Sequence, residues 1–405
     1  MGINYLALAT VICLSTPAQS QGKFNIAESI NKFSVKLLWN ANKVTGSNVN
    51  VALSPLTIWT VLTIVSEGAY DNTADQIDKA LGQNQNKNVI REAYYRLAQL
   101  MDKSEKSEAE FDMATGIFAR KQFPVKRNFA NVVKQYYDAS VTPVDFVNGN
   151  AAADLINKYV AKATRNRITQ LVTAGDVQDA YLFMLSTTFF KGSWQQPFNT
   201  SKTRREAFLD DKRKPIGEVD LMFNSFPYPY SKIDNIKADA LELPYGANGD
   251  YSMLVLVPRG AQSLANMLES LNDEPVLNIL SKIRASHDTY PEDNIYTYLP
   301  KFKITSNFNM DMILQMMGIT DVFDPQKANL LGMFSHYLYL SRVIQRAEIE
   351  VNEEGTVASA ASGFIFPNRI TPPTVKVNRP FAYFIVHRET GSILFCGKIS
   401  DPRTL

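Results

Sequence analysis

VNEEGTVASAASGFIFPNRITPP, residues 351–373, is the stretch from which the fold can be worked out. It begins as a strand, passes into small and weakly polar residues, and ends in a segment that contains three prolines. This composition is typical of an exposed loop. An inert linker is one interpretation. Because loops of about 20 residues are uncommon in compact domains unless they carry function, the stretch favours a functional loop over residues 353–373.

The strand before this loop alternates in polarity. Period two places Val343, Gln345, Ala347, Ile349 and Val351 on one face, with charged residues mainly on the other. Four of the five are apolar, which predicts that this face is buried. An unpaired buried amide costs about 1–3 kcal/mol, so Gln345 is expected to have a partner. The alternative is that its side chain reaches solvent at a sheet edge.

The rest of the chain is helical first and strand-rich later. Strands are predicted at 181–190, 251–257 and 381–386, where the sequence is apolar on both faces. Helices are predicted at 25–43, from Ser54-Pro55 to about 68, and near 73–82, 88–102, 127–137 and 149–163. Neither linker nor repeat divides the chain. We therefore expect one α+β domain, a helical cluster packed on large mixed or antiparallel sheets.

The N-terminus predicts export. Residues 5–16 are apolar but too short to span a bilayer, and Ala18-Gln19-Ser20 follows as a small-x-small cleavage pattern. We expect a signal peptide over 1–20, a mature single domain over 21–405, and an extracellular protein without a membrane anchor. Cys396 then remains alone, as a buried hydrophobe. Asn199-Thr200-Ser201 is a glycosylation sequon that makes Asn199 the candidate site.

Charge and motifs exclude several functions. The formal net charge is +2, and the densest basic stretch, 202–214, is interrupted by acidic residues. It has two readings, a polyanion patch or a solvated hairpin face; we favour the second and expect neither heparin nor nucleic-acid binding. Three histidines without close spacing give no metal-site or triad pattern. We expect a monomer that is not an enzyme and needs no metal or cofactor.

Short motifs along the whole predicted mature chain resemble the serpin family of protease inhibitors. Each motif is weak alone, but their order and spacing are specific. They are, in chain order, Ser54-Pro55-Leu56-Thr57-Ile58, Gly68-Ala69, Phe189-Phe190-Lys191-Gly192 with Trp194 and Phe198, Glu242-Leu243-Pro244-Tyr245, Leu299-Pro300-Lys301-Phe302, Glu353-Glu354-Gly355-Thr356, Asn378-Arg379-Pro380-Phe381, and Gly391 to Pro402. The resemblance implies the serpin fold with an exposed reactive-centre loop. The chain most resembles secreted invertebrate serpins, which suggests a role in regulating a proteolytic cascade.

The resemblance also places the bond that a protease would cleave. In inhibitory serpins the hinge glycine lies 14 residues before the residue that enters the protease's primary pocket, and counting from Gly355 reaches Arg369. The implied reactive bond is Arg369–Ile370. An arginine there implies a trypsin-like target, since that class holds a carboxylate in the pocket. The expected partner is an extracellular, Arg-specific serine protease.

The hinge favours an inhibitor over a non-inhibitory relative. The family mechanism is cleavage, acyl-enzyme trapping, and insertion of the loop as a new strand in the central sheet. The hinge comprises Glu353, Glu354, Gly355, Thr356, Ala358, Ala360 and Ser362. The last four of these point inward on insertion in this reading, and none is large or charged, so insertion buries no unpaired charge. The alternative is a non-inhibitory serpin serving as carrier, storage protein or chaperone.

Two further groups are carried over from the resemblance. Lys301 and Glu353 stand where family members form a salt bridge at the breach, the end of the sheet where insertion begins. At the shutter, in the middle of the sheet, the family commonly pairs an Asn with a His. Here those positions are Ser186 and Gln345. We predict that Ser54, Thr57, Ser186 and Gln345 form a polar cluster that replaces the pair.

Overall fold

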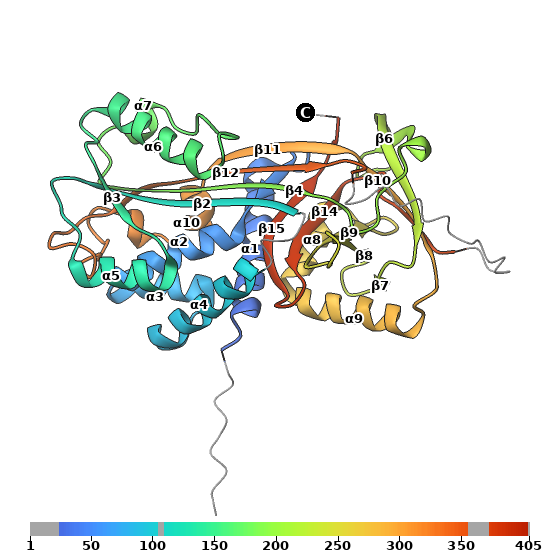
Figure 1. Ribbon diagram of the computed structural model, residues 1–405, viewed down its shortest axis with the longest axis horizontal. Coiled ribbons are helices and arrows are strands. Elements are labelled where there is room, and N and C mark those ends of the chain that lie inside the picture. The colour runs from blue at the N-terminus through green and yellow to red at the C-terminus, as the bar shows by residue number, and fades with distance from the viewer. Residues whose placement is uncertain (1–23, 104–108, 355–371, 404–405) are drawn as a thin grey trace, which may run out of the picture.

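The computed structural model describes residues 24–103, 109–354 and 372–403. Three sheets and a set of helices pack around shared cores in this part of the chain (Figure 1). This is the α+β architecture that the sequence predicts. No helix among the described residues has the length and apolar character needed to cross a bilayer.

The helices fall mainly in the first half of the chain. Their bounds are α1 Ile26–Thr45, α2 Pro55–Gly68, α3 Asp71–Leu81, α4 Lys87–Lys103, α5 Arg127–Tyr137, α6 Gly149–Ala163, α7 Ala174–Val177, α8 Leu264–Ser270, α9 Val276–Thr289 and α10 Asp311–Met316. The six helices that the sequence predicts are present, and each of their ends lies within two residues of the predicted position. Helices α7 to α10 were not predicted individually.

The strands form sheets of six, five and four. The six-stranded sheet has the order β1 (Val51–Leu53), β15 (Ser392–Ile399), β14 (Phe381–His387), β9 (Tyr251–Pro258), β8 (Ala238–Tyr245) and β7 (Tyr230–Ile233). The five-stranded sheet has the order β11 (Phe302–Asn309), β12 (Leu340–Val351), β4 (Leu182–Gly192), β2 (Ala109–Arg120) and β3 (Val141–Val144). The four-stranded sheet has the order β13 (Thr374–Lys376), β10 (Ile295–Pro300), β6 (Pro215–Phe226) and β5 (Arg204–Leu209).

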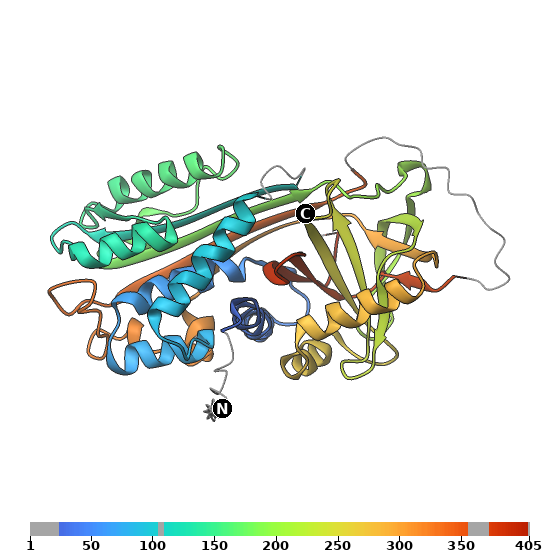
Figure 2. The same ribbon diagram turned by 60° about the horizontal axis from the view of Figure 1, so that its bottom comes forward.

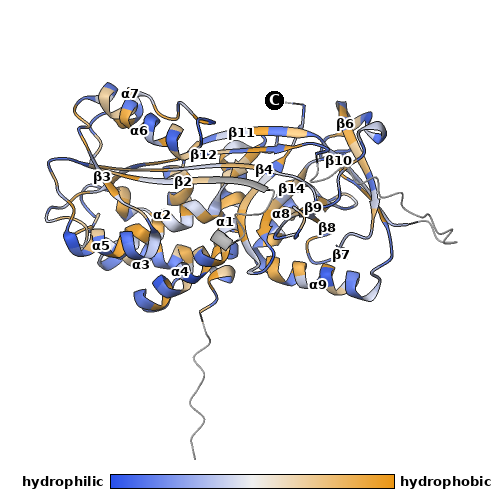
Figure 3. Cartoon of the chain, in the orientation of Figure 1, coloured by the Kyte–Doolittle hydropathy of each residue, from blue (hydrophilic) through white to orange (hydrophobic). Residues whose placement is uncertain are grey.

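Helices cover both faces of the five-stranded sheet. In Figure 1, α6 and α7 lie above it, and α2 to α5 lie below it. Helices α8 and α9 pack against the six-stranded sheet, which Figure 2 shows from another side. Along α4 and α9 polar and apolar residues alternate around the axis in Figure 3, as expected for helices with one face on a core.

Helix α2 explains how the two larger sheets share one core. All but one of its 14 residues are buried, because it is enclosed by other elements on every side. Pro55 at the first helical position needs no hydrogen-bond partner for its nitrogen. At the other end Gly68 meets Gly332 so closely that a side chain on either would clash with the facing segment. Ser54 stands at the N-cap position of α2, as Ser54-Pro55 predicts, but its side chain makes no capping hydrogen bond; its hydroxyl donates to the Leu394 carbonyl at 3.0 Å instead.

Candidate functional site

The predicted loop connects two sheets. Strand β12 ends at Val351 in the five-stranded sheet, and β13 begins at Thr374 in the four-stranded sheet. The reactive bond Arg369–Ile370 and the hinge residues Gly355, Thr356, Ala358, Ala360 and Ser362 lie outside the described residues. So does the predicted signal peptide, 1–20. The site that can be described is therefore the sheet on one side of the loop and the strand on the other.

Strands β12 and β4 run parallel at the centre of the five-stranded sheet, and we call this pair the seam. Their register runs from Leu340 opposite Leu182 to Glu350 opposite Lys191, with a shift between Leu340 and Arg342. Parallel pairing is slightly less stable per residue than antiparallel pairing. The buried face of β12 is the one that its alternation predicts. The seam thus leads directly into the predicted hinge.

A buried polar cluster lies under the middle of the seam. Gln345 is fully buried and stands opposite Ser186 in the register, so the alternative in which it reaches solvent is wrong. Its Nε2 donates to the Ser54 carbonyl at 2.8 Å and lies 3.3 Å from the Ser186 hydroxyl and 3.4 Å from that of Thr57. The hydroxyls of Thr57 and Ser186 are hydrogen-bonded to each other. All four predicted residues therefore meet, and their role as a shutter stays a prediction.

The cluster differs from the expectation in two ways. Ser54 contributes its backbone carbonyl rather than its hydroxyl. Gln345 Oε1 has no hydrogen-bond partner among the described residues, so the Ser–Gln pair does not satisfy the amide completely. The hydroxyls of Thr187 and Thr188, next along β4, are also buried without such a partner there. Leaving buried polar atoms unpaired is destabilising. The seam is therefore less stable than it would be if all of its buried polar groups were hydrogen-bonded.

An ion pair closes the end of the seam near the loop. Lys301 Nζ lies 2.9 Å from Glu353 Oε2, and the Thr203 hydroxyl donates to Glu353 Oε1 at 2.8 Å. Burial by itself would raise the pKa of the Glu353 carboxyl, but the hydrogen bonds from Lys301 and Thr203 outweigh it and hold the pKa below its usual range. The predicted contact is present; its function during loop insertion stays a prediction. Thr203 was not predicted, and no motif pointed to it.

Trp194 holds the last described residues before the loop. Its indole Nε1 donates to the Asn352 carbonyl at 2.7 Å, and its backbone nitrogen donates to the Glu354 carbonyl at 3.1 Å. The ring stacks on Tyr245 of β8, with ring centroids 4.2 Å apart. Gly192 allows this packing, because a side chain there would run into the Tyr245 ring. The motif analysis included Trp194, but nothing in the sequence showed that it ties β12 to the six-stranded sheet.

Lys191 pairs with Glu354 on the outer side of the same end. The distance from Lys191 Nζ to Glu354 Oε2 is 2.9 Å, and a second contact joins Lys191 to Glu350 at 3.6 Å. The hydrogen bond from Lys191 lowers the pKa of the Glu354 carboxyl. Both hinge glutamates that the structure describes are thus held by lysines, Glu354 by Lys191 of β4 and Glu353 by Lys301, which lies between β10 and β11. They fix the point from which the loop departs.

The other predicted features are distributed over the surface and the core. Asn199 is exposed at the start of a short 3₁₀ helix, where its side chain accepts hydrogen bonds from the Ser201 nitrogen and hydroxyl. Cys396 is fully buried, and burial raises the pKa of its thiol. The described residues contain no group of three or more His, Cys, Asp or Glu side chains arranged to hold a metal ion.

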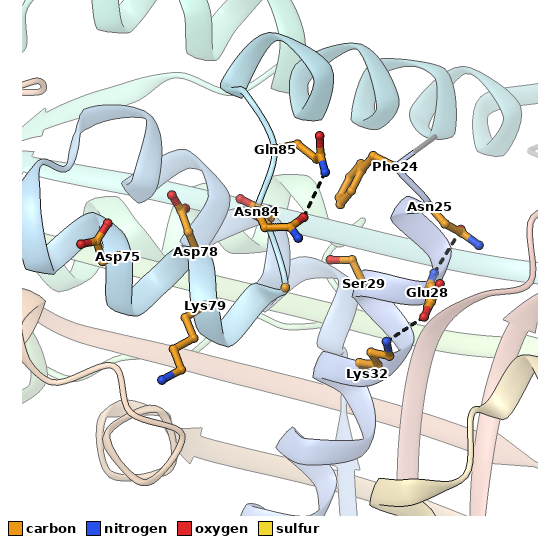
Figure 4. A pocket seen from close by; sticks show the side chains of 12 residues that line it. Phe24, Asn25, Glu28, Ser29, Lys32, Asp75, Asp78, Lys79, Asn84 and Gln85 are labelled. Atoms are coloured by element: carbon orange, nitrogen blue, oxygen red, sulfur yellow. Dashed lines mark hydrogen bonds and ion pairs between the residues drawn. The ribbon is translucent and has the colours of Figure 1, made fainter. Parts of the chain in front are cut away.

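A hollow of about 840 Å³ lies away from the seam, between the start of α1 and the end of α3 (Figure 4). Its lining mixes acidic side chains, such as Glu28 and Asp78, with basic ones, such as Lys32 and Lys79. Lys32 and Glu28 neutralise each other across 2.7 Å. Because both signs of charge are present, the hollow favours no class of charged ligand, and no residue of β4 or β12 lines it.

Comparison with known proteins identifies the family. The family model Serpin (serine protease inhibitor) matches residues 28–402, so the chain belongs to the serpin family. Leukocyte elastase inhibitor of Xenopus tropicalis is 33% identical over 93% of this chain and 100% of its own length. Neuroserpin of Homo sapiens is 29% identical over 99% of this chain and 97% of its own. The fold matches that of Manduca sexta serpin-12, with a TM-score of 0.79 at 24% identity over 92% of this chain and 98% of that one.

Proposed function

We propose that this serpin is a secreted suicide inhibitor of a trypsin-like serine protease, and that it is not itself an enzyme. The protease attacks the Arg369–Ile370 bond and is held as an acyl-enzyme. The loop then enters between β12 and β4. The single observation that carries this proposal is the seam: two parallel strands, directly continuous with the hinge, with a partly unsatisfied polar cluster between them.

Strand insertion converts one ladder into two. A new strand between β12 and β4 would turn a parallel pair into two antiparallel pairs, since the loop folds back along β12. Antiparallel pairs are the more stable kind. The two ion pairs at Glu353 and Glu354 hold the end of β12 where the loop departs, so the fold-back begins at a defined residue. Insertion is then downhill, and the trapped protease moves with the loop.

Specificity for a trypsin-like target rests on Arg369 alone. A guanidinium pairs with the carboxylate in the primary pocket of that protease class. Export rests on the apolar stretch 5–16 and the cleavage pattern that ends at Ser20. The exposed Asn199 suits glycosylation in the secretory pathway.

Bovine trypsin provides the direct test. We expect a covalent complex that survives SDS, with release of a C-terminal peptide that begins at Ile370. Arg369→Ala should abolish trapping, because the pocket loses its charge-assisted partner. The matched control is Arg127→Ala, which removes an exposed arginine on α5 and should leave trapping unchanged. Cleavage without a complex would favour a carrier, storage or chaperone role, and a peptide with another first residue would refute the count from Gly355.

A further inference from the structure

Three arginines converge on the turn that follows β9. Arg213 lies in the turn between β5 and β6, and its Nη2 donates to the Gly260 carbonyl at 2.5 Å and to that of Pro258 at 3.4 Å. Arg379 precedes β14 and donates from Nη1 to the same Pro258 carbonyl at 3.5 Å. Arg259 stands between these two carbonyls in the chain. We call Arg213 and Arg379 the arginine pair.

The arginine pair differs from Arg259 in its counter-charges. Arg259 lies 2.5 Å from Asp234 and 4.0 Å from Asp239, so its charge is compensated. In the described part of the chain, by contrast, no carboxylate oxygen lies within 4.0 Å of Arg213 or Arg379. Two like charges therefore meet at one carbonyl oxygen without an ion-pair partner for either.

Partial burial makes this lack of a counter-charge costly. Both side chains of the pair are half-buried, and Arg379 Nε is buried without a hydrogen-bond partner among the described residues, as is Oδ1 of the preceding Asn378. Burial, and after it the like charge of Arg213, lowers the pKa of the Arg379 guanidinium, and the more distant Asp239 does not outweigh them. Charges taken out of water are destabilising unless they are paired. A bound anion supplies the missing charge.

The spacing of the arginine pair suits an oxyanion. Nη2 of Arg213 and Nη1 of Arg379 both lie at the long end of the hydrogen-bond range from one oxygen, so these nitrogens are at most about 7 Å apart. A phosphate or sulfate, with oxygens about 2.5 Å apart that accept bonds of about 2.8 Å, bridges nitrogens up to about 8 Å apart. There is also room, since a Cβ added to Gly260 would meet no atom within 4 Å.

The surroundings favour a single small anion over a polyanion. Asp210, in the same turn as Arg213, accepts hydrogen bonds from the backbone nitrogens of Lys212 and Lys214 at 2.8 and 2.9 Å. A polyanion is matched by an unbroken row of cations, which this carboxylate interrupts. Guanidinium groups present their N–H donors in a rigid fork that fits the oxygens of phosphate and sulfate. The pair is therefore a local site with the chemistry of a tetrahedral oxyanion.

We propose that Arg213 and Arg379 bind one tetrahedral oxyanion, a phosphate or a sulfate, either as the free ion or as a group on a larger molecule. The ion joins the β5–β6 turn of the four-stranded sheet to the segment that enters β14 of the six-stranded sheet. It thereby ties two sheets together at a point where the chain alone places two like charges. The proposal does not involve the reactive bond, so it stands or falls separately from the proposed function.

Equilibrium dialysis of the full chain against radioactive inorganic phosphate at low ionic strength tests the site directly. We expect one phosphate per chain, and Arg213→Gln and Arg379→Gln should each weaken binding about ten-fold or more, as for the loss of a hydrogen bond to a charged group. Arg205→Gln is the matched control, because Arg205 is an exposed arginine on the same hairpin and lies 3.7 Å from Glu218. It should bind phosphate as the unmodified chain does.

Thermal melting gives a second readout and shows whether each variant folds. Phosphate should raise the melting temperature over chloride of equal ionic strength, since a ligand of the folded state stabilises it. Phosphate also stabilises folded proteins by exclusion from their surface, so the difference between variants decides. The part of the rise that is due to the site should be lost in Arg213→Gln and retained in Arg205→Gln. Arg379→Lys keeps the charge without the fork and should retain part of the affinity.

The outcomes separate the site from its alternatives. Phenyl phosphate that competes with inorganic phosphate would show that the group can be carried by a larger molecule, and failure to compete would restrict the site to the free ion. An unmodified chain that binds no phosphate at low ionic strength would overturn the proposal, and so would equal binding by the unmodified chain and a folded Arg213→Gln. Equal losses in Arg205→Gln and Arg213→Gln would show a diffuse basic surface and also overturn it.

Discussion

The six-stranded and five-stranded sheets are built from similar apolar residues but differ in strand direction and in the polar groups buried at their centres. Every neighbouring pair in the six-stranded sheet is antiparallel. All residues of β9, β14 and β15 are buried, and so are all but one of those in β8. The five-stranded sheet has the parallel seam at its centre, with buried hydroxyls and an amide beneath it. The comparison indicates that the six-stranded sheet is complete as it stands, whereas the five-stranded sheet is arranged to accept another strand.

The largest expected effect is that of cutting the loop. Cleavage within residues 356–369 by a protease that is not trapped should raise the thermal stability sharply. Insertion adds on the order of ten net backbone hydrogen bonds at about 1 kcal/mol each, all in the five-stranded sheet. Thermal melting of the intact and the cut protein measures this. A cut form that melts no higher would remove the distinction between the two sheets and favour a non-inhibitory serpin.

A cavity in the six-stranded sheet should lower the stability of the intact and the cut protein by the same amount. Phe384 in β14 is fully buried, and Phe384→Ala should lower the free energy of unfolding by about 3–5 kcal/mol. Because the six-stranded sheet does not change on insertion, the loss should be the same in the intact and the cut form, as measured by denaturant unfolding. Unequal losses would show that insertion also remodels the six-stranded sheet.

A charge at the hinge should block the strand-accepting sheet. Thr356→Arg carries an unpaired guanidinium toward the underside of the sheet, which costs several kcal/mol even after relaxation. Loop insertion then becomes slower than deacylation of the acyl-enzyme, so trypsin escapes and the protein becomes its substrate. Thr356→Val keeps the size without the charge and should still trap. The readout is the number of serpin molecules consumed per trypsin trapped, and continued one-to-one trapping by Thr356→Arg would refute the insertion register.

The polar cluster should couple Ser186 to Gln345 in the closed sheet. A double-mutant cycle with Ser186→Ala and Gln345→Met should give a coupling energy of about 1 kcal/mol in the intact protein. In the cut form the new strand separates β12 from β4, so the coupling should fall. Neither side chain titrates near neutral pH, so the coupling should not change between pH 5 and 8. An absent coupling in the intact protein would show that the contacts carry no shutter function.

The smallest effect concerns acid and the Lys301–Glu353 pair. The pKa of Glu353 lies below its ordinary value of 4.5, so the stability that it contributes is fully present above pH 4.5 and is lost as pH falls through the lower, folded pKa. Lys301 is partly exposed, so we expect less than about 1 kcal/mol. Thermal melting between pH 3 and 6 should show a smaller pH dependence in Lys301→Met than in the unmodified protein. Identical pH profiles would assign the shift to other groups.

Local patterns predicted the parts of the fold that depend on single segments. Alternation along β12 placed Gln345 on the buried face, and Pro55 marked the start of α2. The family resemblance brought Lys301 to Glu353 across the sequence, although no local pattern joins them. The direction of the Ser54 hydroxyl was missed, because it is set by the Leu394 carbonyl, which lies 340 residues away in the chain. The stacking of Trp194 on Tyr245 and the hydrogen bond from Thr203 to Glu353 were missed for the same reason, because both join residues that are far apart in the chain.

The outward face of the four-stranded sheet shows the same limit. Phe223, Tyr296 and Tyr298 come from two strands whose pairing the sequence did not reveal, and Lys202 had been read only as part of a basic hairpin. Hairpin alternation predicts which side chains share a strand face. It does not predict which strand from elsewhere in the chain completes that face, since this depends on the packing of whole sheets.

The place of β14 and β15 has a consequence for biosynthesis. These strands, residues 381–399, lie in the interior of the six-stranded sheet, and β15 joins β1 from the start of the chain through Val51 opposite Lys398. A ribosome makes them after the other strands of this sheet, at about 5–20 residues per second. Until they emerge, β1 and β9 each lack a neighbour, and unpaired strand edges promote aggregation. The nascent polypeptide therefore completes this sheet only when β14 and β15 have emerged, and chaperones that shield strand edges during translation should raise its yield.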